Sequence, residues 1–322
     1  MKKEADTALN LANLAKYFSD EDVAREFLEF RRWPNGPVCP HCKASGAYKL
    51  TAKEGSKSPV RPGVYKCKAC RKQFTVKVGT IFEDSHIPLS KWLLAIHLLC
   101  TSKKGMSAHQ LHRNLGVTYK SAWFMAHRIR FAMTQEPLAS KLGGIVEADE
   151  TYIGGKAKNM HASERAKKVT GRGVKDKAPV VTLVERDGRV RSQHMPTVTQ
   201  HNILAALREC VSPDATICSD ESAVYNNTAD EFAGHEAVNH KRGEYVRGEA
   251  HVNTSESFHS LLKRGVHGIY HHWSQHHLHR YLSEYDFRWN LRKVKDGERT
   301  LEALKGFEGK RLMYRQPIGK KK

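Results

Sequence analysis

Residues 145–155 read IVEADETYIGG, an apolar run that carries charge at its centre and ends at two glycines. β-Branched and aromatic residues favour an extended chain, and the glycine pair ends it, so the pattern predicts a strand. Asp149 lies toward the end of this strand. Glu147 and Glu150 flank it, and both are expected to point to the opposite side of a regular strand.

Residues 178–185 and 190–195 form the next two predicted strands. Asp187-Gly188 between them is a strong hairpin signal. Further along, the pattern predicts a helix from Thr199 or Gln200 to Glu209, a strand at 215–220, and helices at 254–264 and 274–292. This half of the chain is therefore predicted to be an α/β unit built on a mixed sheet.

Three acidic residues stand at informative places in this pattern. Asp149 and Asp220 lie at the ends of two predicted strands, and Glu256 opens a downstream helix. Such carboxylates can gather at one sheet edge and hold two hard divalent cations, Mg²⁺ or Mn²⁺. Two such ions about 3.5–4 Å apart promote phosphodiester displacement. Lys263, two helical turns after Glu256, is expected on the same face, where it and Arg264 can bind DNA phosphates.

Two CxxC knuckles predict a metal site nearer the N-terminus. They are Cys39/Cys42 and Cys67/Cys70, separated by 24 residues (43–66). Four thiolates in two pairs match tetrahedral Zn²⁺ in a closed structural site, with His41 as a bystander. The segments beside the second knuckle read as ribbon strands. The alternative is four ordinary buried cysteines.

A helix-turn-helix is predicted between the ribbon and the first long strand. Ser107 is expected to cap one helix, residues 115–118 form a tight turn, and Thr118 caps a longer helix from Tyr119 to Phe131. The outward side chains expected to contact DNA on this helix are Lys120, Arg128 and Arg130. The alternative is an ordinary three-helix packing unit.

The charge distribution indicates a polyanionic partner. The chain has 322 residues, 54 Lys and Arg, 34 Asp and Glu, and a formal net charge of +20. Residues 37–140 alone carry 17 basic and 4 acidic side chains, a net of +13. This excess favours nucleic acid as the partner over a membrane surface. The sequence shows neither an apolar run of roughly 18 residues nor a secretory signal, so a cytoplasmic, nucleoid-associated protein is expected.

The predicted organisation has five parts. They are an N-terminal helical segment (1–36), a zinc ribbon (37–80), the helix-turn-helix (88–138), the α/β domain (143–295) and a basic C-terminal tail (296–322).

Three segments resemble a known family. VEADETYIGGK (146–156), SDESAVYNN (219–227) and the long run from His251 to Arg292 that begins HVNTSESFHSLLKRG look like the DDE transposases of bacterial insertion sequences, 1595-type group. Members of this group place a zinc ribbon ahead of an RNase-H-like catalytic domain. The resemblance covers roughly residues 20 to 295.

The resemblance implies both a fold and an activity. The fold is an RNase-H-like five-stranded mixed sheet with flanking helices. The activity is binding of terminal inverted repeats, cleavage at the element ends and transfer of the 3′-hydroxyl ends to target DNA by two-metal chemistry. A homo-oligomer on double-stranded DNA is expected because two ends must be held together.

The resemblance also assigns the site residues. Asp149, Asp220 and Glu256 match the three acids, with 35 residues (221–255) between the last two, and Lys263 matches the downstream basic residue. Members vary at the third position, so Asn253 is an alternative ligand.

Other interpretations remain open from sequence. Eight histidines fall between His251 and His279, and they either pack and contact the DNA backbone or lie near the metals. Two rival functions are a non-catalytic DNA-binding regulator derived from a transposase and an RNase-H-like nuclease without strand transfer.

Overall fold

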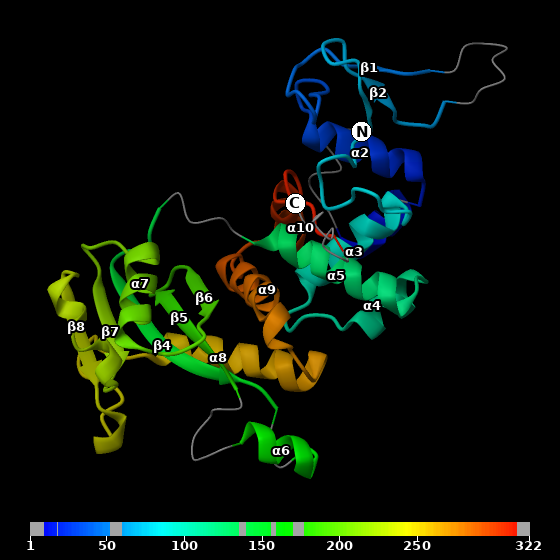
Figure 1. Ribbon diagram of the computed structural model, residues 1–322. Helices are drawn as coiled ribbons and strands as arrows, with labels where there is room; N and C mark the ends of the chain where they lie inside the picture. Colours follow the sequence, from blue (N-terminus) through cyan, green and yellow to red (C-terminus); the bar gives the residue numbers. More distant parts are fainter. Residues whose placement is uncertain are drawn as a thin grey trace, which may run out of the picture. The chain divides into compact units, whose positions relative to one another are not determined.

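The computed structural model describes residues 10–17, 19–51, 60–134, 140–155, 159–169 and 177–313. The chain forms two units (Figure 1). The ribbon unit consists of residues 1–102, 106–133 and 294–322, and the sheet unit consists of residues 103–105 and 134–293.

A five-stranded mixed sheet forms the centre of the sheet unit, with strand order β6-β5-β4-β7-β8. Its strands are β4 (Ile145–Ile153), β5 (Ala178–Glu185), β6 (Val190–His194), β7 (Thr216–Asp220) and β8 (Gly234–Val238). β5 runs antiparallel to both β4 and β6, whereas β7 runs parallel to β4 and β8 parallel to β7. The predicted RNase-H-like mixed sheet is confirmed.

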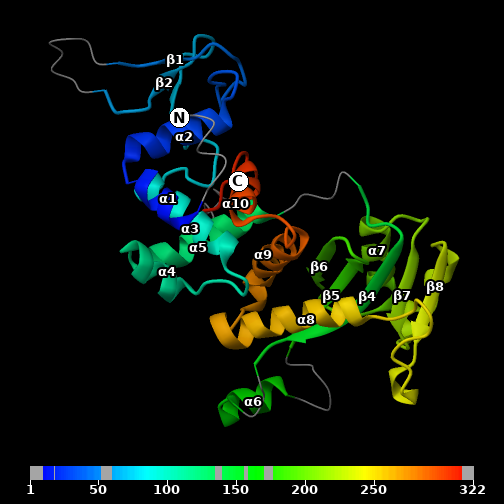
Figure 2. The ribbon, with the colours of Figure 1, turned by 180° about the vertical axis from the view of Figure 1, so that it is seen from behind.

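Helices cover both faces of this sheet (Figure 2). Val181 and Leu183 of β5 pack in one core with Ile203 of α7 (Gln200–Cys210). The intervening Val180 and Val184 pack in a second core with residues of α8 (Asn253–Gly265) and α9 (Leu278–Asn290). Successive side chains of β5 point to opposite faces, so apolar layers bury the sheet on both sides. Each fully buried aliphatic side chain contributes roughly 1.5–3 kcal/mol to the free energy of unfolding.

The ribbon unit begins with two helices and a small antiparallel sheet. These are α1 (Leu11–Tyr17), α2 (Glu21–Arg32), β1 (Tyr48–Lys49), β2 (Tyr65–Lys66) and β3 (Gln73–Phe74). Asp20 caps α2, since its side chain accepts a hydrogen bond from the backbone N–H of Asp22. Trp33 packs edge-on against the rings of Tyr65 and Phe74, so the end of α2 is joined to the ribbon strands.

The predicted helix-turn-helix follows α3 (Leu89–Thr101) in the same unit. It consists of α4 (Ala108–Leu115) and α5 (Tyr119–Met133). Ser107 caps α4 by accepting from the Gln110 N–H, and Thr118 accepts from the Ser121 N–H at the start of α5. Gly116 ends α4 with φ of 59°, a left-handed conformation that glycine adopts at no steric cost.

A further helix replaces the first part of the predicted basic tail. α10 (Asp296–Lys305) buries Thr300, Ala303 and Leu304, and packs against α3. The Thr300 hydroxyl also lies 2.9 Å from Nδ1 of the buried His97. The tail prediction for 296–322 was wrong over this helix because the short apolar stripe is hidden among charged residues. Residues 314–322 lie outside the described residues.

Shorter elements complete the chain. α6 (Ala162–Lys168) lies between β4 and β5 in the sequence, and residues 156–158 and 170–176 on either side of it lie outside the described residues. A π-helical turn (Val266–Tyr270) continues α8, and a 3₁₀ turn (Gln275–His277) precedes α9. The remaining 3₁₀ turns are Ala223–Tyr225, Thr228–Asp230 and His240–Arg242. No helix in the described ranges is long and apolar enough to span a membrane.

Candidate active site and zinc site

The sheet brings two of the predicted acids to the same level. β4 and β7 are parallel, with Val146 opposite Ile217 and Glu147 opposite Cys218. Continued by two residues along each strand, this register places Asp149 opposite Asp220. Side chains at matching positions of neighbouring strands point to the same face of the sheet. Both carboxylates are therefore directed toward the layer that contains α8.

The third predicted acid reaches this place from the first turn of α8. A pocket of about 530 Å³ is lined by Asp149 of β4 and by a continuous face of α8 that includes Glu256 and, two turns later, Lys263. The remaining residues that line this pocket are Glu150, His259, Ser260, Arg264 and His267. Lys263 and Arg264 thus lie where the sequence predicted phosphate contacts. Asp220 and Asn253 are not among the lining residues.

The electrostatics of the pocket centre on Asp149. Burial raises the pKa of its carboxyl to about 7, and the negative charges of Glu150, Asp220 and Glu256 add to the rise. The Glu150 backbone N–H opposes the shift by donating to Asp149 Oδ1 at 2.7 Å. Burial likewise raises the pKa of Glu150. Within the described residues, no lysine or arginine forms an ion pair with Asp149, Asp220 or Glu256.

His259 connects α8 to β4 and β5 at the same point. Its Nδ1 lies 3.4 Å from Asp149 Oδ2, and its Nε2 lies 2.7 Å from the Thr182 hydroxyl. Thr182 in turn donates to the Asp149 carbonyl at 3.1 Å. Burial lowers the pKa of His259 to about 3, so the ring is neutral at physiological pH. His259 stands three residues after Glu256, and this helical spacing is the signal by which the sequence could have identified it.

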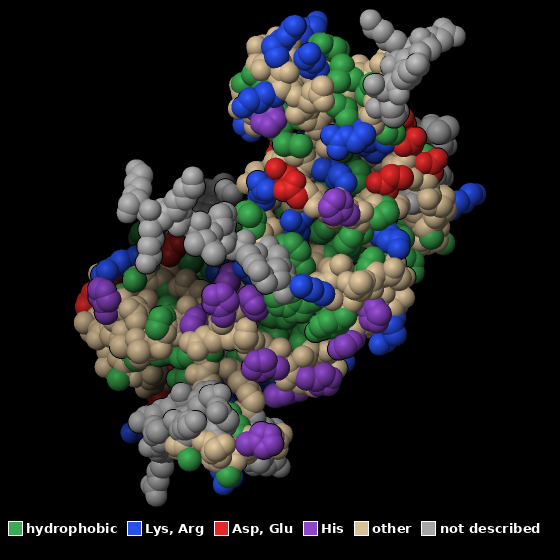
Figure 3. Space-filling view, turned by 45° about the vertical axis from the view of Figure 1, so that its right-hand side comes forward, with side chains coloured by type: hydrophobic (Ala, Val, Ile, Leu, Met, Phe, Trp, Pro, Cys, Tyr) green, Lys and Arg blue, Asp and Glu red, His purple; other side chains and the backbone are tan. Residues whose placement is uncertain are grey.

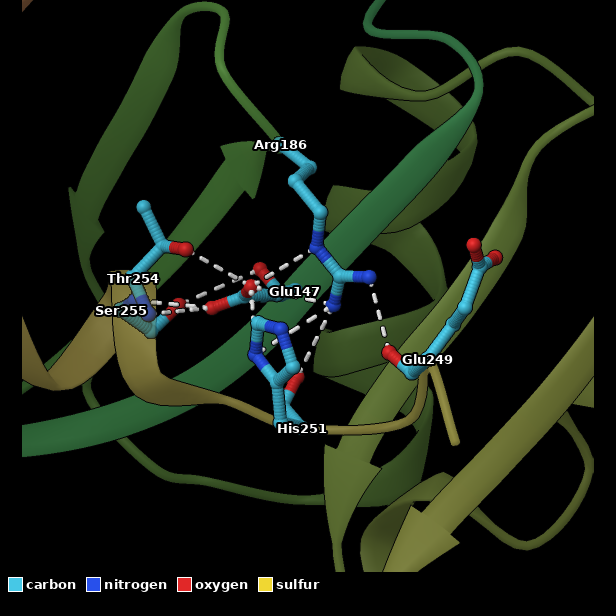
Figure 4. Close-up of polar contacts among 6 residues, drawn as sticks. All are labelled: Glu147, Arg186, Glu249, His251, Thr254 and Ser255. Carbon is cyan, nitrogen blue, oxygen red and sulfur yellow. Dashed lines mark hydrogen bonds and ion pairs between the residues drawn. The ribbon is translucent and has the colours of Figure 1, made fainter. Parts of the chain in front are cut away.

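The side of the strand predicted for Glu147 is wrong. This residue was expected on the side opposite Asp149, but residues two apart on a strand share a face. Its fully buried carboxylate contacts Arg186, His251 and the first turn of α8 (Figure 4). Glu150, one residue after Asp149, is on the other side, where burial and then the nearby charge of Glu150 raise the pKa of Tyr225.

Two of the three side chains predicted to point outward from the helix-turn-helix are buried. Arg128 is 7% exposed and Arg130 is 2% exposed. The Arg128 guanidinium donates to the carbonyls of Ile81 and Glu83, both at 2.8 Å, so it supports the fold of the ribbon unit. Lys120 is exposed, as predicted. The burial could not be read from the sequence because it depends on chain segments far from α5.

The histidines between His251 and His279 do not form a single cluster. His259 is buried in the site, and His251 lies beside Glu147. Most of the others are exposed, and the space-filling view shows histidine side chains (purple) on the surface (Figure 3). In the part of the chain that the structure describes, no histidine belongs to a metal-ligand group.

The four ribbon cysteines form the second site. Their sulfur atoms all lie within 4.8 Å of one another, with Cys39 and Cys70 at 3.6 Å and Cys42 and Cys67 at 3.6 Å. The two knuckles repeat one backbone turn. In each, the N–H of the residue after the second cysteine donates to the carbonyl of the first, at 2.9 and 3.1 Å, and that residue has φ of 61°. This arrangement fits a tetrahedral Zn²⁺ and provides four sulfur ligands.

Comparison with known proteins identifies the family. A family model described as an ISXO2-like transposase domain, of the IS1595 group, matches residues 141–290, and a transposase zinc-ribbon domain matches residues 19–73. The chain is also 31% identical over 263 residues to an uncharacterized protein in transposable element ISH50 of Halobacterium salinarum. That match covers 77% of this chain and 84% of the relative. The chain belongs to the ISXO2-like transposases. The predicted family is confirmed.

A solved structure also matches this transposase. It is the simian T-cell lymphotropic virus intasome in complex with PP2A regulatory subunit B56 gamma, at 16% identity over 62% of this chain and 73% of that chain. The TM-score of this match is 0.29. The zinc-ribbon match and the four-cysteine cluster together indicate Zn²⁺ in the ribbon of the transposase.

Proposed function

We propose that this transposase binds the terminal inverted repeats of its element, cleaves DNA at the element ends and transfers the 3′-hydroxyl ends to target DNA. The observation that carries the proposal is the convergence of Asp149 and Asp220, at matching levels of two parallel strands, with Glu256 on the facing helix. Family membership supports the same reaction class.

The residues of the pocket fit a divalent cation. Burial, together with the nearby charges of Glu150, Asp220 and Glu256, raises the pKa of Asp149, and no lysine or arginine in the described residues forms an ion pair with Asp149, Asp220 or Glu256. Carboxylate oxygens are the ligands preferred by Mg²⁺ and Mn²⁺. We assign Asp149, Asp220 and Glu256 as the ligands, because the charges of Asp220 and Glu256 both act on Asp149. Glu256 is preferred to Asn253 because it is a carboxylate and lines the pocket. Two cations held there would activate the attacking oxygen and stabilise the leaving one.

The other side chains of the pocket bind and orient the DNA. Lys263 lies between the acid pocket and a neighbouring pocket that also contains Lys177. These ammonium groups and Arg264 provide positive charge beside the acids, where the scissile phosphate must enter. His259 is neutral and holds the Asp149 carboxylate from the α8 side.

Water displaces the 3′-oxygen of the element end in the first step, which leaves a free 3′-hydroxyl. That hydroxyl then attacks a target phosphodiester and displaces its 3′-oxygen, with no covalent protein intermediate. The ribbon and the helix-turn-helix, with Lys120 exposed, supply the surface that recognises the ends. A dimer or larger homo-oligomer on double-stranded DNA holds the two ends together.

The experiment that tests this function uses purified protein and a DNA fragment with the element ends that flank the gene. Wild type, Asp149→Ala and the matched surface variant Glu236→Ala are incubated with Mg²⁺, Mn²⁺ or chelator. We expect 3′-end nicks and products joined to a target plasmid for wild type and Glu236→Ala only, and only with metal. End binding without nicks under both metals would instead support a regulator, and nicks without joined products a nuclease.

A further inference from the structure

The helix that carries Glu256 begins without a cap of its own. Val252 occupies the N-cap position of α8, and an apolar side chain offers no acceptor for the free N–H groups of the first turn. The first helical hydrogen bond within α8 is made by the N–H of Glu256. The N–H groups of Thr254 and Ser255 precede it, and both need an acceptor from elsewhere.

Glu147 of β4 supplies that acceptor. Its Oε2 accepts from the backbone N–H of Thr254 at 2.8 Å and of Ser255 at 3.0 Å, and its Oε1 accepts from the Thr254 hydroxyl at 2.8 Å (Figure 4). A carboxylate is favoured here because the N-terminus of a helix carries partial positive charge. The strand therefore caps the helix.

Two basic groups hold this carboxylate in place. The Arg186 guanidinium donates to Glu147 Oε1 at 3.2 Å and to the Glu249 carbonyl at 2.8 Å. His251 Nδ1 lies 3.2 Å from the same Oε1. Because Glu147 is fully buried, these partners are required to compensate the loss of water around its charge. Its position is fixed from three sides.

We propose that Glu147 is a positioning residue of the metal site, which fixes the separation between Asp149 and Glu256. The inference rests on the proposed function. Glu147 and Asp149 lie two residues apart on one strand face, and Ser255, which Glu147 binds, is the residue before Glu256. One rigid carboxylate thus ties the helix turn that carries one ligand to the strand that carries another.

The test compares Glu147→Gln and Glu147→Ala with the control Glu284→Gln. Glu284 is equally buried, pairs with Arg288 on its own helix and accepts from the Tyr270 hydroxyl of the π-helical turn after α8, so its substitution reproduces the loss of a buried ion pair outside the first turn of α8. Hydrogen exchange without metal or DNA should show the Thr254 and Ser255 amides exchanging at least about 10-fold faster in both Glu147 variants. The half-saturating Mn²⁺ concentration for DNA cleavage should rise about 10–100-fold. The rise should be smaller for Gln, which keeps one acceptor oxygen, and both readouts should stay unchanged in Glu284→Gln.

The outcomes separate this proposal from the function on which it rests. If wild type cleaves, Asp149→Ala does not, and the Glu147→Gln Mn²⁺ dependence equals that of wild type, then Glu147 only stabilises the fold and the positioning role is overturned. Equal shifts in Glu147→Gln and Glu284→Gln would overturn it too. If wild type shows no metal-dependent cleavage, the proposed function itself fails. Glu147→Gln keeps the test decisive if Glu147→Ala does not fold.

Discussion

The zinc site and the acid site are built in opposite ways. Each half of the zinc site is a short backbone turn, and the same turn occurs at Cys39 and at Cys67. The acid site takes its residues from two strands and a helix, and in the described residues its three carboxylates do not form a group whose oxygens all lie within 4.8 Å of one another, as the four sulfurs do. In the zinc site, one local turn positions each pair of ligands. The acid site places like charges from distant elements beside one another, so a cation is needed to compensate them.

Loss of the Asp149 carboxylate should disable the acid site. Asp149→Ala should reduce end cleavage by at least about 10³-fold, because it removes the proposed ligand at the centre of the site. Binding to the element ends should stay within about twofold of wild type. Gel-based cleavage and binding assays measure the two properties, and lost binding by a folded variant would argue against a purely catalytic role.

Loss of one cysteine ligand should disable the zinc site. Cys39→Ser should release Zn²⁺ and weaken specific end binding by at least about 10-fold, because the ribbon depends on its metal for folding. Metal content by mass spectrometry and binding to the ends are the measurements. Wild-type zinc content in this variant would mean that the four cysteines do not form the site. The buried Cys100→Ser is the matched control, since it lies outside the cluster.

The acid site, unlike the zinc site, should make the stability of the protein fall as pH rises. The pKa of Asp149 is about 7 in the folded protein against 3.8 for an unperturbed aspartate. A raised folded pKa means that the native state binds the proton more tightly, so stability falls as pH rises from about 4 to 7. At pH 8 without divalent metal, Asp149→Asn should therefore raise Tm, by about 2–4 °C for each kcal/mol relieved.

Calorimetry with and without Mg²⁺ measures this effect. Added Mg²⁺ should stabilise wild type more than the Asn variant, because the ion compensates the buried charge. An Asn variant that is less stable than wild type at pH 8 would show that the charge of Asp149 does not destabilise the folded protein. No such gain is expected for any substitution at the zinc cysteines.

Lys120 and Arg128 of α5 should differ in what their substitution changes. Lys120→Ala should leave Tm unchanged and reduce the slope of log affinity for DNA against log salt by about 1, since one phosphate contact is lost. Arg128→Ala should instead lower Tm, because the carbonyls of Ile81 and Glu83 lose their donor. A salt titration and a thermal melt test the pair, and a lowered Tm for Lys120→Ala would contradict the exposed role.

Local patterns predicted most of the fold. The Asp187-Gly188 signal located the β5–β6 hairpin, and the caps Ser107 and Thr118 located the helices of the helix-turn-helix. Spacing and family resemblance together selected Asp149, Asp220 and Glu256, and the first two lie at matching levels of neighbouring strands.

What the sequence could not predict depends on contacts between distant segments. The burial of Arg128 depends on residues 81–83, and the role of Glu147 depends on a helix that begins more than a hundred residues later. Glu147 was also misassigned, although the two-residue period of a strand already places it beside Asp149. α10 was missed because three buried positions in ten residues leave a weak apolar pattern.

Because α10 packs against α3, the ribbon unit cannot finish folding until the end of the chain has been synthesised. The chain leaves the ribbon unit after residue 133 and re-enters it at residue 294, so the sheet unit is an insertion within it. The ribosome must therefore release the entire sheet unit before the apolar face of α3 receives its last partner. A premature stop after residue 293 would leave every proposed catalytic residue intact and damage the ribbon unit instead.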